Sequence, residues 1–175
     1  NVNNFEAMMP SSANWQSVTY GDGKFVAISH YPVIAAYSMD GIKWTESTLP
    51  SSTTNWASVT YGDGKFVAIA GGFDVAAYSI DGINWTQSTL PSSANWSSVT
   101  YGNGKFVAIA IQSYTSAYST DGINWTQTDM PSLSSMWGPV TYGNDKFVVI
   151  AVGTNIAAYS EDGINWIQTN MPTSA

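Results

Sequence analysis

Short apolar runs separated by turn-forming residues recur along the whole chain, and they predict β-strands. The runs "SVTYG" at 17–21 and "KFVAI" at 24–28 are rich in β-branched and aromatic residues. Between them stand Asp22 and Gly23, which favour the positive φ angles of a tight hairpin turn. No stretch shows the 3.6-residue hydrophobic period of an amphipathic helix. The pattern predicts an all-β chain.

This pattern is repeated four times. A tryptophan opens each copy, at spacings of 41, 40 and 41 residues, and we expect these side chains to pack in the core: Trp15, Trp56, Trp96 and Trp137. Each copy contains four short segments, named a to d here, which span 15–20, 24–29, 34–38 and 43–48 in the first copy. Four antiparallel strands per repeat of about 40 residues is typical of a β-propeller blade. We therefore predict one propeller domain over 1–175, with four four-stranded blades at about 14–50, 55–91, 95–131 and 136–172.

The N-terminal segment adds a surplus strand of the d type within residues 1–10. The sequence "NNFEAMMPSSANW" at 3–15 aligns with "NWTQSTLPSSANW" at 84–96, while the C-terminal "NWIQTNMP" already supplies the fourth d strand. Either four blades close within the chain and the segment lies over an edge, or it pairs with a neighbouring chain. An eight-bladed ring from two chains and a fragment of a longer propeller are both open at this point.

A Ser-x-Asp-Gly-x-x-Trp motif joins segments c and d in every copy. It reads "AYSMDGIKWT" at 36–45 and returns as "AYSIDGINWT", "AYSTDGINWT" and "AYSEDGINWI". Serine and aspartate side chains hydrogen-bond to the backbone of such turns, and the tryptophan offers a large apolar area between blades. One carboxylate per turn is too few to hold a cation. We interpret the motif as a structural joint.

The motif resembles the Asp-box, or BNR repeat, of sialidase-like β-propellers, in a form one residue shorter than the usual spacing from Asp to Trp. The whole repeat is also similar to the Asp-box repeat arrays of bacterial and phage surface proteins. The resemblance implies a propeller that uses the Asp-boxes as folding elements and binds its ligands on the opposite face. A sialidase binds its substrate carboxylate through arginines, and this chain has no arginine, so the resemblance does not carry that activity over.

The b–c connections differ from copy to copy, whereas the a–b and c–d turns are nearly constant. In an up-and-down blade the b–c and d–a connections share one rim, and unconstrained drift of exposed loops is one explanation of the variation. The other is binding, because aromatic, amide and hydroxyl groups together suit neutral sugars. The residues expected to bind a neutral glycan or cell-surface ligand are His30, Tyr31, Phe73, Asp74, Gln112, Tyr114, Thr154 and Asn155, beside Asn14, Asn55 and Asn95 of the d–a connections.

Composition excludes several partners. Only 10% of the residues are charged and the formal net charge is -7, so the chain would repel a nucleic acid backbone. It has no cysteine, and no apolar run approaches the ~20 residues of a membrane span. A surface rich in Ser, Thr, Asn, Trp and Tyr is commoner outside cells, and we expect a secreted or cell-surface protein without membrane insertion.

Catalysis is not expected. Glycoside hydrolysis needs two carboxyl groups roughly 5 to 9.5 Å apart, and Asp74 alone lies among the variable tips. His30 is the only histidine, so a triad or a histidine metal site has no partners, and no cofactor is expected. The leading hypothesis is a non-catalytic recognition module. The alternative is an assembly protein that self-associates through residues 1–9, and an enzyme has the least support.

Overall fold

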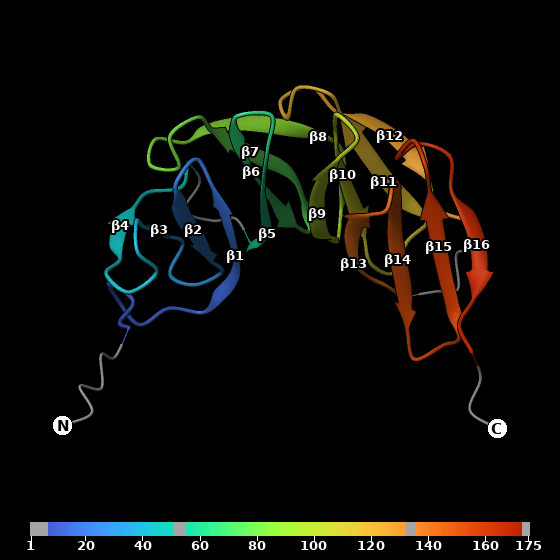
Figure 1. Cartoon of the computed structure of the whole chain (residues 1–175), viewed down its shortest axis with the longest axis horizontal. Helices are drawn as coiled ribbons and strands as arrows, with labels where there is room; N and C mark the ends of the chain where they lie inside the picture. Colours follow the sequence, from blue (N-terminus) through green and yellow to red (C-terminus); the bar gives the residue numbers. More distant parts are fainter. Residues whose placement is uncertain (1–6, 51–54, 132–135, 173–175) are drawn as a thin grey trace.

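The computed structural model describes residues 7–50, 55–131 and 136–172, which form four separate sheets of four antiparallel strands each. The sheets follow one another along an arc, and the first and fourth lie at its opposite ends (Figure 1). Within the described residues there is no helix, and hence none that would be long and apolar enough to cross a membrane. The predicted all-β architecture of four four-stranded blades is confirmed.

Each blade takes its strands in sequence order. Blade 1 contains β1 (Trp15–Gly21), β2 (Lys24–Ser29), β3 (Ala35–Ser38) and β4 (Thr45–Ser47). Blade 2 contains β5 (Asn55–Gly62), β6 (Lys65–Gly71), β7 (Phe73–Ser79) and β8 (Thr86–Ala94). Blade 3 contains β9 (Trp96–Gly102), β10 (Lys105–Ala110), β11 (Thr115–Ser119) and β12 (Thr126–Asp129). Blade 4 contains β13 (Met136–Gly143), β14 (Lys146–Val152), β15 (Ile156–Ser160) and β16 (Ile167–Asn170).

The a–b hairpins turn as their sequence predicts. Asp22 and Gly23 both have positive φ angles, of 46° and 73°, which is the backbone of a two-residue type I′ turn. In blade 4 the pair is Asn144 and Asp145, with φ angles of 48° and 58°. Asn and Asp tolerate the left-handed region better than other non-glycine residues, so the turn is kept although this copy lacks one glycine.

The c–d motif is a hydrogen-bonded joint in every blade. In blade 3, Ser119 Oγ donates to Asp121 Oδ1 (2.9 Å) and accepts from the Gly122 N–H (2.8 Å). The same Asp121 oxygen accepts from the N–H groups of Ile123 and Asn124, at 2.8 Å each. Equivalent bonds hold the other three joints, at Asp40, Asp81 and Asp162. The carboxylate accepts its hydrogen bonds from its own turn, as expected for a structural joint.

Hydrophobic side chains from neighbouring blades form the core. Between blades 1 and 2, Ile28 and Leu49 pack with Trp56 and Val59 of β5. The next two boundaries repeat this cluster around Trp96 and Trp137, and all three tryptophans are fully buried. Burying one large side chain is worth about 1.5–3 kcal/mol. Hydrophobic contacts between neighbouring blades are therefore the main interaction that stabilises the arc.

A tyrosine of each following blade lies against a glycine of the blade before it. A Cβ atom added to Gly62 would stand 2.0 Å from Tyr101 Cγ, and the pairs Gly21 with Tyr61 and Gly102 with Tyr142 are equally close. A side chain cannot share that space. A glycine is therefore needed at these positions so that the next blade can pack closely, and not because of the hairpin turn that follows. Around Gly143, at the end of the arc, an added Cβ would meet nothing within 4 Å.

Blade 2 departs from the predicted loop boundaries. Phe73 and Asp74, expected on an exposed loop tip, belong to strand β7, because Gly72 alone separates it from β6 and its φ of 81° makes a tight turn possible. Strand β8 also runs through Pro91 to Ala94, which pairs with Phe73. The proline was expected to end this segment, but a proline is compatible with an edge strand whose N–H side faces away from the ladder.

The tyrosine–glycine contact predicts a large difference between two similar substitutions. Gly62→Ala forces a methyl group into the ring of Tyr101 and is expected to lower the free energy of unfolding by about 1–3 kcal/mol. Gly143→Ala is the matched control, because its methyl group enters open space. Urea denaturation followed by tryptophan fluorescence measures both, and equal losses would contradict the role assigned to the close approach.

The aspartate joints predict acid sensitivity. Partial burial by itself would raise the pKa of Asp121, but hydrogen bonds from Asn124, Ile123 and Ser119 favour the charged form and hold that pKa well below its ordinary value of 3.8. Because the folded pKa is lowered, this stabilisation is present above the ordinary pKa and is lost as the pH falls towards the folded value.

We therefore expect the urea midpoint to fall as the pH is lowered below about 5. The fall should be smaller in Asp121→Asn, which is already less stable at neutral pH. Asp63→Asn is the control, since it removes only an exposed ion pair with Lys65 (3.8 Å). If Asp121→Asn and the unmodified chain have identical pH profiles, the aspartate joint is not the source of the acid sensitivity.

Candidate functional site

The starts of the innermost strands of blades 1 to 3 surround a cavity of about 510 Å³. Strands β1, β5 and β9 lie next to one another on the inner side of the arc, so residues at the same place in successive repeats come together. Its walls come from β1, β5 and β9 and from the b–c and d–a connections: Gln16, His30, Asn55, Trp56, Ala57, Gly71, Asn95, Trp96, Ser97 and Ile111. The cavity thus opens on the rim where the repeats differ.

Hydrogen bonds tie the two kinds of connection together beside this cavity. The backbone N–H of His30 donates to the Asn14 carbonyl oxygen (2.9 Å), and the N–H of Asn14 donates to the Tyr31 carbonyl oxygen (2.8 Å). In blade 3 the N–H of Ile111 donates to the Asn95 carbonyl oxygen (2.9 Å) in the same way. These backbone bonds hold the loop residues of the cavity in place.

The single histidine contacts an amide of the next blade. His30 Nδ1 is hydrogen-bonded to Asn55 Oδ1 across the boundary between blades 1 and 2. The contact orients both side chains at the cavity wall. Its partner is an amide and not a carboxylate, so it does not form the base-and-orienter pair of a catalytic triad.

A second cavity, of about 360 Å³, lies between blades 2 and 3. Gln112, whose φ is 57°, belongs to its wall together with Ser92, Ser93 and Ser113. Asn95 and Ile111 line both this second cavity and the first one. Polar, uncharged side chains therefore continue along the rim from one blade boundary to the next.

The structure brings together only some of the predicted site residues. His30, Asn55 and Asn95 line the first cavity, and Gln112 lines the second. The others stand outside both cavity walls: Asn14, Tyr31, Phe73, Asp74, Tyr114, Thr154 and Asn155. Tyr31, Phe73 and Tyr114 are exposed side chains on different blades. They do not form one aromatic platform with the cavity.

Gln16 and Ser97 are cavity residues that the sequence reasoning missed. They follow the tryptophan that opens each repeat, at a position occupied by Gln16, Ala57, Ser97 and Gly138 in the four copies. This variation inside an otherwise constant strand is the signal that could have found them. Trp56 and Trp96 reach the wall too, but they are fully buried in the core and present no ring face to a ligand.

The cavity chemistry is neutral. Apart from His30, its lining holds amide, hydroxyl and apolar groups and no aspartate, glutamate or lysine. Within residues 7–50, 55–131 and 136–172, no three His, Asp or Glu side chains converge as metal ligands. The walls offer hydrogen bonds in both directions, since an amide both donates and accepts. Such a site is suited to holding a polar uncharged group.

Comparison with solved structures identifies the architecture. The chain superposes on virginiamycin B lyase from Staphylococcus aureus with a TM-score of 0.80 at 19% identity, covering 94% of this chain and 58% of the lyase. The fold is that of a β-propeller. YCF48 from Cyanidioschyzon merolae gives a TM-score of 0.74 at 15% identity, with 97% and 60% covered. A nidogen/laminin complex gives 0.71 at 10%, with 89% and 64% covered.

These propellers differ in what they do, and the likeness shows the fold alone. The first is named a lyase, while the last is a complex of two proteins. This chain spans less than two thirds of the length of each of these matched chains. No protein-family model matches the chain, and neither does any curated protein.

Proposed function

We propose that this propeller is a non-catalytic recognition module that binds a neutral glycan in the cavity between blades 1, 2 and 3. The observation that carries the proposal is the lining: three amides and the Ser97 hydroxyl, contributed by three blades, line one space of about 510 Å³ without a carboxylate or an ammonium group. That volume is within the range of small-molecule sites. It is large enough for one or two sugar rings.

The ligand class follows from the wall chemistry. Gln16, Asn55 and Asn95 each bring an amide, which matches the paired donor and acceptor character of sugar hydroxyls. A charged ligand would lose its hydration without finding a counter-charge. Tyr31 and Tyr114 are exposed on the same rim, where they can stack on further sugar rings that extend beyond the cavity.

Two related expectations belong to the same proposal. We infer that the c–d joints are Asp-boxes, which is supported by the Ser-Asp-Gly hydrogen bonds repeated in all four blades. We also infer a secreted or cell-surface location, supported by a sequence rich in neutral polar and aromatic residues and poor in charged ones. YCF48 bound to D1 peptide and the nidogen/laminin complex make a peptide or protein the competing ligand class.

The cavity is tested by binding measurements with two matched variants. We expect neutral oligosaccharides on a glycan array to bind the intact chain, and Asn55→Ala or Asn95→Ala to weaken that binding about 5- to 30-fold, because a buried sugar hydroxyl loses its partner. Asn155→Ala, on the same rim but outside the cavity, is the control. Calorimetric titration gives the dissociation constants.

Two results would overturn this proposal. One is the absence of binding to any neutral glycan at millimolar concentration. The other is binding that is lost in Asn155→Ala and kept in Asn55→Ala, which would move the ligand to the loop tips. Tight binding of a peptide in place of a glycan would keep the cavity and replace the ligand class.

A second candidate, assembly through residues 1–9, is supported by one contact. Met8 forms a parallel bridge with Lys43, and Thr89 at the end of the blade 2 d strand forms the same bridge with Asn124 of blade 3. Met8 therefore lies against blade 1 in the same way as the d strand of blade 2 lies against blade 3. Residues 1–6, which the proposed strand exchange also needs, lie outside the described residues.

Removing residues 1–9 tests this second candidate. If the segment exchanges between chains, the deletion should convert an oligomer to a monomer in sedimentation velocity, with an unchanged circular dichroism spectrum. A mass that is the same before and after deletion would contradict strand exchange. The glycan proposal is unaffected by either result.

A further inference from the structure

The two ends of the arc expose the two halves of one interface. On blade 1, Val18 is 59% exposed and Tyr20 is 58% exposed. Val59, which occupies the position of Val18 in blade 2, is only 5% exposed because blade 1 covers it. Blade 1 therefore presents a face that is covered by a preceding blade everywhere else in the chain.

Blade 4 presents the opposite half. Val148 and Ile150 of β14 are 37% and 45% exposed, whereas the equivalent Val107 and Ile109 of blade 3 are completely covered by blade 4. Each internal boundary joins these two kinds of face. In the described part of the chain no complete blade covers either face at the ends of the arc, and only the short segment with Met8 and Met9 lies on the blade 1 face.

Two glycines show that the end faces have complementary shapes. Gly143 of blade 4 has open space where Gly62 receives Tyr101, and Tyr20 of blade 1 has no glycine to lie against. At the other contact, a Cβ on Gly122 would lie 2.8 Å from Val67 of the preceding blade, but Gly41 of blade 1 meets only Phe25 of its own blade. The free partner for Gly41 is a valine such as Val148.

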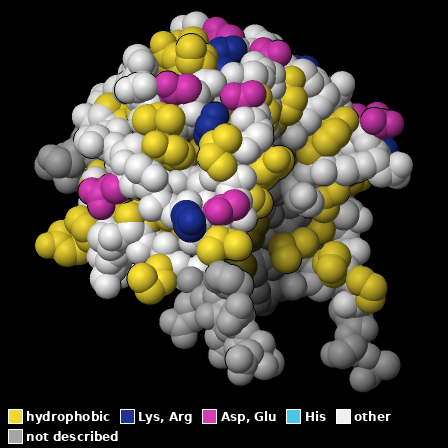
Figure 2. All heavy atoms as spheres, turned by 60° about the vertical axis from the view of Figure 1, so that its left-hand side comes forward, with side chains coloured by type: hydrophobic (Ala, Val, Ile, Leu, Met, Phe, Trp, Pro, Cys, Tyr) yellow, Lys and Arg dark blue, Asp and Glu magenta, His cyan; other side chains and the backbone are white. Residues whose placement is uncertain are grey.

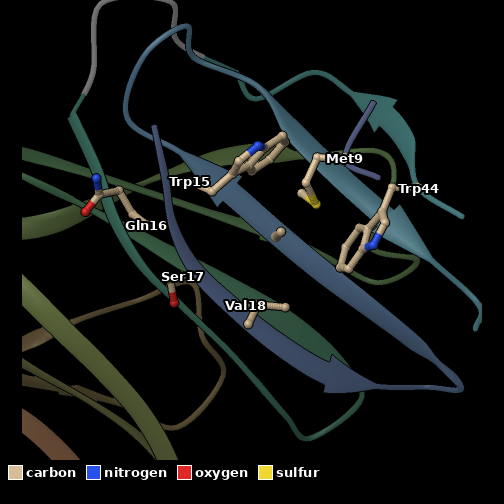
Figure 3. A pocket seen from close by; sticks show the side chains of 7 residues that line it. Met9, Trp15, Gln16, Ser17, Val18 and Trp44 are labelled. Carbon is tan, nitrogen blue, oxygen red and sulfur yellow. The ribbon is translucent and has the colours of Figure 1, made fainter. Parts of the chain in front are cut away.

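The blade 1 face is apolar and hollowed. Hydrophobic side chains gather on this end of the molecule when it is turned forward (Figure 2). A cavity of about 340 Å³ lies there, with Met9 between the rings of Trp15 and Trp44 and with Val18 beside them (Figure 3). Apolar surface of this kind on a folded protein marks an interaction site.

We propose that a second copy of this chain docks on these faces, with blade 4 of one copy packed on blade 1 of the other as blades pack inside the chain. Tyr20 then lies against Gly143 of the second copy, and Gly41 against its Val148. Two copies joined in this way at both ends make a closed ring of eight blades, the upper end of the usual range. Each junction is identical, as the two-fold symmetry of such a ring requires.

The proportions of the arc support two copies. Blades 1 and 4 lie at opposite ends of an open arch (Figure 1), and the chain covers 58% of virginiamycin B lyase, a propeller of greater length. A second arc of the same size therefore supplies enough blades to complete a ring. The inference concerns the end faces alone and does not rest on ligand binding in the cavity.

The new junction is weaker than the internal ones. At each internal boundary a serine accepts a backbone hydrogen bond from the next blade, for example Ser98 Oγ from the Val140 N–H (3.0 Å). Blade 4 has Pro139 at this serine position, so the N–H of Val18 finds no such acceptor there. Met9 and Met171 also stand at equivalent repeat positions, and one of them has to leave when the faces meet. The association is therefore reversible and depends on concentration.

The test measures the mass of the full chain by sedimentation velocity from micromolar to near-millimolar concentration. We expect a rise to twice the 18.8 kDa of one chain. Gly143→Val should abolish this rise without unfolding the chain, because Gly143 lies outside the left-handed region and its side-chain space is empty in one copy. Tyr20→Ser should do the same from the other face.

Pro139→Ser is the opposite variant, and it should strengthen each of the two identical junctions about 5-fold by restoring the acceptor, so the dimer should tighten by roughly 25-fold. Thermal unfolding of each variant at low concentration separates a lost contact from a lost fold. A monomer at every concentration, or a dimer unchanged by both Gly143→Val and Tyr20→Ser, would overturn the proposal. A dimer that survives removal of residues 1–9 but not Gly143→Val supports face docking over strand exchange.

Discussion

Contact between neighbouring sheets is the interaction on which this structure depends. A four-stranded sheet of 30 to 40 residues cannot bury both of its faces alone, and too small a core is not stable in isolation. In this chain the large buried side chains, such as Trp56, Trp96 and Trp137, lie at blade boundaries. The stability of each blade is therefore shared with its neighbours, as in other repeat proteins.

The candidate site depends on the same contact. Because the tryptophans at the boundaries hold β1, β5 and β9 side by side, the residues next to them in sequence converge on one cavity. Gln16 belongs to blade 1 and Ser97 to blade 3, and only the packing of successive blades brings them to a common wall. The joints at the other rim keep the strands in register and leave the cavity rim free to vary.

Much of the architecture could be predicted because it is local. Hairpin turns, the Ser-Asp-Gly joints and the four strands of each repeat follow from residues that are close in sequence, such as Asp22 with Gly23. The close approach of Tyr101 to Gly62 could not be predicted, since it joins residues about one repeat apart and the glycine looked like part of a turn.

The site was predicted only in part for a related reason. Variability pointed to the rim on which the cavity opens, and His30, Asn55 and Asn95 are in the cavity wall. Exposure of loop tips did not indicate which side chains converge, so Tyr31 and Asn155 were grouped with residues that lie elsewhere. Phe73 and Asp74 were expected on a loop tip. Gly72 alone turns the chain there, so both residues belong to a longer β7.

The adjacent tyrosine and glycine of the a strand have a consequence for how such a chain changes its length. Tyr61 lies against Gly21 of the blade before it, while Gly62 receives Tyr101 of the blade after it. One repeat thus carries both the projection and the recess that its neighbours require. Duplication or loss of a whole repeat preserves every match, whereas insertion of part of a repeat does not. Propellers built this way can gain or lose entire blades without inventing a new contact.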